Sequence, residues 1–140
     1  MECRFDTIRA VKEIRRESPV CGLDVVSYDG DNYIRAVEDG GWCVAFLNHG
    51  DRFTVPTYME RHNETDEVFV LLAGEATLLI GESGQKVKMS VGKIYNVHKG
   101  TWHQIVTKPG AHCLVVENSD TSRSNTDYLE LAALPSGDNT

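Results

Sequence analysis

The stretch YMERHNETDEVFVLLAG, residues 58–74, decides the fold expected for this chain. Its apolar run, Val68–Leu72, is apolar on both faces of a strand, so one face can fill an interior while the other needs cover from another element or a partner chain. In the polar part, side chains at alternate positions share one face. The stretch therefore predicts two strands, joined by a polar turn at residues 63–66, that bring polar groups to an apolar interior.

The rest of the chain continues the same pattern. From residue 22 onward, glycines separate short runs rich in β-branched and aromatic residues. Many short strands at turn-limited spacing are typical of a β-sandwich or closed barrel. No strand alternates with a ten-residue helix, which argues against a parallel α/β sheet. Besides the run already quoted, the expected strands are Leu23–Ser27, Trp42–Leu47, Ala76–Ile80, Ile94–Val97, Gln104–Thr107 and Cys113–Val116.

The two ends of the chain differ from this middle part. Apolar residues recur every three positions from Phe5 to Ile14, which predicts a short amphipathic N-terminal helix that Pro19 ends. At the other end, a polar segment is followed by a second apolar run. The expected organisation is a helical segment over residues 1–20, a β-barrel over 21–118, and a C-terminal extension over 119–140 that packs on the barrel within the same domain.

Length and charge bound the function. The chain has 140 residues and a net charge of −7, which fits one domain and argues against binding to nucleic acid or to an anionic membrane surface. No apolar stretch is long enough to cross a bilayer, and the first residues lack the order of a secretion signal. The four cysteines include no C-x-x-C pair, so we expect thiols in a reducing compartment, and hence a cytoplasmic location.

Five polar side chains are candidates for a shared site. If residues 56–62 form a strand, then Tyr58, Glu60 and His62 lie on one face. The polar turn resets the alternation, so that Glu67 can face inward at the start of the next strand. His103 follows a Lys-Gly turn and opens another strand, so it can face the same interior. Imidazole nitrogens and carboxylate oxygens are common ligands of divalent metal ions.

These residues carry a family resemblance across roughly residues 50–117. Together with the segment GKIYNVHKGTWH at residues 92–103, the quoted stretch resembles the two motifs of the cupin superfamily. Glu60 stands where the first motif usually has its first histidine, and His98 stands where the second usually has proline. The matching positions are His62, Glu67 and Gly74 in the first motif, and Gly92, Gly100 and His103 in the second.

The resemblance implies an antiparallel jelly-roll barrel with one divalent metal ion inside. Its ligands would be His62, Glu67 and His103, joined by Glu60, and the ion would be Zn, Fe, Mn or Ni. The extra carboxylate favours harder cations, or else Glu60 does not ligate and the site is weak or holds no metal. The resemblance and the two-sided apolar strand also imply a homodimer.

Two functions of different classes remain open, so whether the chain is an enzyme is undecided. The first is a metal-dependent lyase, isomerase or oxygenase that acts on a small polar metabolite, with Tyr58 and Trp102 lining the substrate pocket. The second is a non-catalytic module that binds a small ligand such as a sugar or an organic acid, which the departure at Glu60 favours. A weaker alternative is a ureidoglycolate-lyase-like activity, suggested by the run Gly100–His103.

Overall fold

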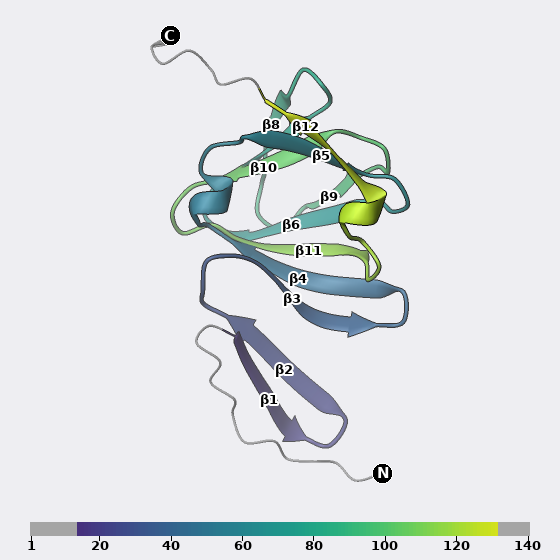
Figure 1. Cartoon of the computed structure of the whole chain (residues 1–140). Helices are drawn as coiled ribbons and strands as arrows, with labels where there is room; N and C mark the ends of the chain where they lie inside the picture. Colours follow the sequence, from purple (N-terminus) through teal and green to yellow (C-terminus); the bar gives the residue numbers. More distant parts are fainter. Residues whose placement is uncertain (1–13, 132–140) are drawn as a thin grey trace.

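The computed structural model describes residues 14–131 and places ten of its strands in two facing antiparallel sheets (Figure 1). Sheet I has the spatial order β12 (Thr126–Glu130), β5 (Tyr58–His62), β10 (His103–Thr107), β7 (Ala76–Ile80) and β8 (Gln85–Lys88). Sheet II has the order β3 (Asn32–Asp39), β4 (Trp42–Asn48), β11 (His112–Asn118), β6 (Glu67–Ala73) and β9 (Ile94–Val97). A separate hairpin consists of β1 (Ile14–Val20) and β2 (Leu23–Tyr28).

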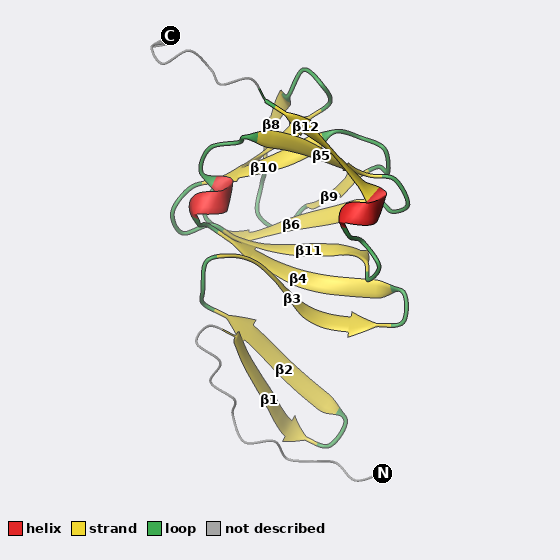
Figure 2. Ribbon diagram, viewed as in Figure 1, coloured by secondary structure: helices red, strands yellow, loops and turns green. Residues whose placement is uncertain are grey.

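Two short 3-10 helices lie on opposite sides of the opening between the sheets, as Figure 2 shows in red. They are η1 (Asp51–Phe53), which precedes β5, and η2 (Arg123–Asn125), which precedes β12. The hydroxyl of Ser122 accepts a hydrogen bond from the Ser124 backbone, and Asn125 bonds back to the Ser122 backbone, which stabilises η2.

The core lies between the sheets because successive side chains of a strand point to opposite faces. In β6, Phe69 and Leu71 are buried and face the interior, while Leu72 is 47% exposed. They pack with inward residues of the neighbouring strands and of the opposite sheet. These other members include Ala45, Leu47, Cys113 and Val115 from sheet II and Leu78 and Ile105 from sheet I.

The mainly β, antiparallel fold expected from the sequence is confirmed, but the closed barrel is not. Each of the seven expected runs lies in a strand. Within residues 14–131, however, no strand pair joins sheet I to sheet II. The edge strands β8 and β9 have only four residues each, and each pairs with a single neighbour. The two sheets therefore face each other as an open sandwich, with the core between them.

The expected N-terminal helix is wrong for the part of it that can be tested. Residues 1–13 lie outside the described residues, but Ile14–Val20 form strand β1. β1 pairs with β2 across a two-residue loop, in which Gly22 has φ +89°. Pro19 sits where the pairing register shifts, a position at which an edge strand tolerates proline. A helix this short is marginal alone, whereas β1 is also anchored to sheet II, where the Arg16 guanidinium donates to the backbone oxygen of Ala36.

The cysteines differ from expectation in one case. Cys43 and Cys113 are free and buried, as expected for small apolar thiols, but Cys21 is disulfide-bonded. The cytoplasmic location stays a prediction. Among the residues described, no helix is long and apolar enough to cross a membrane.

Candidate metal centre

Four of the candidate residues meet between the two sheets. Glu60 and His62 lie on β5, and His103 opens β10, directly opposite Glu60 in the strand pairing. Glu67 opens β6 on the facing sheet, with the same inward direction as Phe69. The turn at residues 63–66 carries the chain from sheet I to sheet II. His62 and Glu67 therefore face the same interior, although five positions along one straight strand would place them on opposite faces.

The potential ligand atoms of these four side chains all lie within 4.8 Å of one another. Glu67 is central: its Oε1 lies 2.8 Å from Nε2 of His103 and 3.3 Å from Nε2 of His62. Glu60 Oε1 is farther away, at 3.8 Å from His62 Nε2 and 4.0 Å from His103 Nε2. His62, Glu67 and His103 are buried, while the Glu60 side chain is 19% exposed toward the opening.

Each histidine is held by its other ring nitrogen. His103 Nδ1 lies 2.9 Å from the backbone carbonyl oxygen of Thr101, and His62 Nδ1 lies 2.9 Å from the hydroxyl of Thr126. Thr126 stands opposite His62 in the pairing of β12 with β5, so the sheet itself positions this contact. Such bonds orient a metal-binding imidazole and leave its Nε2 free to ligate.

The pKa of Glu67 is lowered, and its contact with His103 in this ionised form requires a positive species. A carbonyl oxygen only accepts, so His103 Nδ1 carries a proton, and a neutral ring then presents a lone pair at Nε2. A lone pair facing a carboxylate oxygen at 2.8 Å is repulsive unless the imidazole is protonated or a cation is bound. His62 Nε2 is likewise buried and makes no hydrogen bond within the described residues. The donor set therefore fits a metal ion.

The pKa values reflect the same crowding of charges. Burial lowers the pKa of His103, but the Glu67 carboxylate more than offsets this and raises it above its ordinary value. His62 follows the same pattern. Burial alone would raise the pKa of Glu67, yet its contacts with the two histidines hold it well below its usual range. Burial, with the Glu67 charge, raises the pKa of Glu60.

A fifth polar residue, Glu117, was missed by the sequence analysis. It lies on β11 and is 7% exposed, with Oε2 3.8 Å from His62 Nε2. The Tyr33 hydroxyl donates a hydrogen bond of 2.8 Å to its Oε1. Burial and the nearby Glu67 carboxylate raise the pKa of Glu117 to about 8. Strand alternation was the available signal, because Cys113 and Val115 on the same face are buried.

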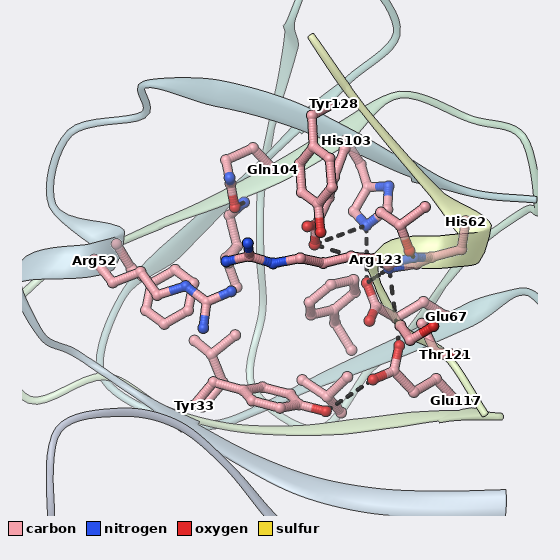
Figure 3. Close-up of a pocket in the computed structure, with 18 of the residues that line it drawn as sticks. Tyr33, Arg52, His62, Glu67, His103, Gln104, Glu117, Thr121, Arg123 and Tyr128 are labelled. Carbon is pink, nitrogen blue, oxygen red and sulfur yellow. Dashed lines mark hydrogen bonds and ion pairs between the residues drawn. The ribbon is translucent and has the colours of Figure 1, made fainter. Parts of the chain in front are cut away.

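A cavity of about 210 Å³ extends from these side chains to the opening between the sheets (Figure 3). Its floor holds the candidate ligands and Glu117, and its mouth is lined by Arg52 from η1, Arg123 from η2 and Tyr128 from β12. Pockets that hold drug-sized ligands measure roughly 300–1,000 Å³, so this smaller cavity suits a small metabolite.

The two residues expected to bind substrate do not line this cavity. Tyr58 packs edge-on against Tyr128, with ring centroids 5.6 Å apart, and lines the neighbouring surface. Trp102 lies under the guanidinium of Arg61, 4.5 Å from its ring centroid. A substrate-binding role for either residue stays a prediction.

The three remaining histidines lie outside this cavity. His49 bonds to Thr107 and His112 to Asn48, each at 3.0 Å. The His98 side chain is 81% exposed.

Comparison with known proteins supports the fold. No protein-family model and no curated protein matches the sequence. Among solved structures, a variant of Streptomyces Pac13 with uridine has 7% identity and a TM-score of 0.60, over 95% of this chain and 94% of that one. Pac13 is described as a nucleoside dehydratase with a β-barrel.

Two further structures are similar over a large part of the chain. KdgF from Halomonas sp. has 15% identity and a TM-score of 0.53, over 84% of this chain and 89% of that one. A cupin-2 domain protein from Shewanella frigidimarina has 18% identity and a TM-score of 0.51, over 65% and 84%. Likeness at such low identity shows the fold, and the cupin fold expected from the two motifs is confirmed.

Proposed function

We propose that this protein is a metal-dependent cupin enzyme in which Glu60, His62, Glu67 and His103 hold one divalent ion. When bound, the ion would act as a Lewis acid toward an oxygen atom of a small polar substrate. The observation that carries the proposal is the orientation of the two histidines. Each is anchored through Nδ1 and turns Nε2 toward the same carboxylate oxygen.

The surroundings of the site support chemistry as well as binding. The floor of the cavity is buried, so water is largely excluded from the polar groups there and their electrostatic interactions are strong. Glu117 is held by Tyr33 and adds a further carboxyl group beside His62. Lyase, isomerase and oxygenase reactions are all consistent with such a site, and the ureidoglycolate-lyase-like activity stays a prediction that rests on Gly100–His103.

Metal analysis of protein purified without chelator tests the proposal. We expect about one ion per chain in the wild type and loss of most of it in His62→Ala and His103→Ala, because each variant removes a ligand. Thr126→Val, which removes only the anchor of His62, should weaken metal binding by roughly 10-fold to 100-fold.

His98→Ala is the matched control, since this histidine is exposed and outside the cavity, and it should bind metal like the wild type. A wild-type protein that retains no metal, and takes up none of Zn²⁺, Fe²⁺, Mn²⁺ or Ni²⁺ after dialysis, contradicts the proposal.

A second candidate, a metal-free ligand-binding module, is favoured by one contact. At 2.8 Å, a protonated His103 forms a satisfied ion pair with Glu67 and needs no metal. In that case a bound small ligand raises the melting temperature equally with and without chelator. A rise that chelator abolishes favours the metal-dependent enzyme.

A further inference from the structure

The mouth of the cavity carries two arginines, Arg52 and Arg123, that form no ion pair with an acidic side chain of residues 14–131. Arg52 lies on η1 and Arg123 on η2, so they enter from opposite sides of the opening between the sheets. In Figure 3, the side chains of Arg52 and Arg123 extend toward each other across the pocket, to one side of His62 and His103. Within residues 14–131, neither guanidinium forms an ion pair or a side-chain hydrogen bond with the protein.

Arg35, the third arginine of this cavity, shows the contrast. Its guanidinium donates to the backbone oxygens of Ser119 and Thr121, both at 2.7 Å, and pairs with Glu38 at 3.3 Å. Its donors are therefore committed to holding the chain before η2. Arg52 and Arg123 have no such structural task, and their donors remain available to a ligand.

Aromatic rings position the guanidinium of Arg52. The Cζ of Arg52 lies 5.2 Å from the ring centroid of Phe53 and 5.9 Å from that of Tyr33. A guanidinium held against aromatic rings keeps its N–H edges exposed, and those edges match the oxygens of a carboxylate or phosphate. Two like charges that point toward each other repel, and an anion between them removes that cost.

The charges of the cavity also favour an anion. Glu60 and Glu67 together balance the double charge of a divalent ion held among the four candidate ligands. The two arginines add positive charge at the mouth of the cavity. A substrate with a negative group at one end and a polar group at the other fits this gradient.

We propose that the substrate is a small anionic metabolite whose carboxylate or phosphate group lies between Arg52 and Arg123, with its polar end toward the metal site. This inference rests on the proposed function for the metal end of the substrate. The arginines act as anion-binding residues at the mouth and set the direction in which the substrate enters.

Calorimetric titration of metal-loaded protein, freed of excess metal, tests the inference. Inorganic phosphate and acetate serve as probes of the two anionic groups, at constant ionic strength set with chloride. We expect one of them to bind, roughly tenfold more weakly in Arg52→Gln or Arg123→Gln, and without measurable affinity in the double variant. The anion that binds more tightly, phosphate or acetate, identifies the anionic group of the substrate.

Lys86→Gln is the matched control. It removes one positive charge from the exposed strand β8 and should bind both anions like the wild type.

Three results separate the inference from the metal proposal. If the double variant retains its metal and binds both anions as tightly as the wild type, the anions bind elsewhere and the inference is overturned. If neither probe binds the metal-loaded wild type, it is overturned as well. If the wild type holds no metal but its anion binding still depends on the two arginines, the anion site stands and only the metal proposal fails.

Discussion

At the scale of single residues, Glu117 combines burial with a chargeable group in the floor of the cavity. It is surrounded by Tyr33, His62 and Glu67, and its pKa is raised from 4.5 to about 8 by burial and by the Glu67 carboxylate. Between these two pH values, the folded protein keeps a proton on Glu117 that the unfolded chain releases. In metal-free protein, the stability contributed by this group is therefore full below pH 4.5 and is lost as the pH rises through about 8.

The Glu117→Gln substitution tests this dependence. We expect the wild type to lose stability relative to Glu117→Gln as the pH rises from 5 to 8, measured as the free energy of unfolding in urea with metal removed by chelator. Glu82→Gln, which changes an exposed glutamate in the turn between β7 and β8, should follow the wild type. If the free energy of unfolding depends on pH in the same way for the wild type and Glu117→Gln, the pKa of Glu117 is not raised.

The residues of the site differ in how well the sequence predicts them. Strand alternation and one polar turn suffice to bring His62, Glu67 and His103 to one interior, because their backbone positions determine their direction. Arg52 and Arg123 could not be found in this way. Both lie on short 3-10 helices that show no repeating pattern, and their long side chains reach the cavity only through the tertiary fold.

At the scale of elements, Gly74 explains why the first motif ends in glycine. It follows β6 with φ +78°, and a Cβ atom there would lie 2.6 Å from the backbone oxygen of Gly110 and 2.7 Å from Ala111. Both obstacles are backbone and cannot rotate away. Gly81 has the same φ of +78° but open space around it. The pair separates the cost of the backbone conformation from the cost of crowding.

The two alanine substitutions should therefore differ in stability. Gly81→Ala should cost about 1 kcal/mol, the penalty of a left-handed conformation with a side chain. Gly74→Ala should cost roughly 2–4 kcal/mol, because the β10–β11 loop must also move. Urea denaturation of both variants checks this, and equal losses would show that Gly74 is retained for its φ alone.

The strands themselves were predictable, and the errors lie at the ends and edges. Glycine-separated apolar runs locate β4, β6, β7, β9, β10 and β11, each of which buries side chains, and also β2, whose Leu23 and Val25 are exposed. β1 and β8 carry mostly polar or charged side chains, which a helix or a loop would tolerate equally well. Whether the two sheets join into a closed barrel depends on pairing between strands far apart in the chain. The local pattern of apolar and polar residues does not predict such pairing.

At the scale of the whole molecule, the β1–β2 hairpin leaves apolar side chains uncovered. Figure 1 shows it beyond β3, at the edge of sheet II. Val20, Leu23 and Val25 are 56%, 49% and 46% exposed. A two-stranded hairpin is marginally stable alone, and clustered exposed apolar residues are typical of an interaction surface. We therefore expect two copies of the chain to associate through their hairpins, the homodimer that the sequence analysis predicts.

Sedimentation velocity at micromolar concentration should give twice the chain mass of 15.6 kDa for the wild type. Replacing Leu23 and Val25 with Asp should yield a monomer, because burying two carboxylates at a dimer contact is strongly unfavourable. Val91→Asp changes an equally exposed valine in the turn before β9 and should remain dimeric.

A monomeric wild type would refute the dimer, and a dimeric Leu23→Asp/Val25→Asp variant would place the contact on another face. If the dimer forms through the hairpins, the cavity mouth between η1 and η2 remains open, so metal content and anion affinity should be unchanged in the monomeric variant.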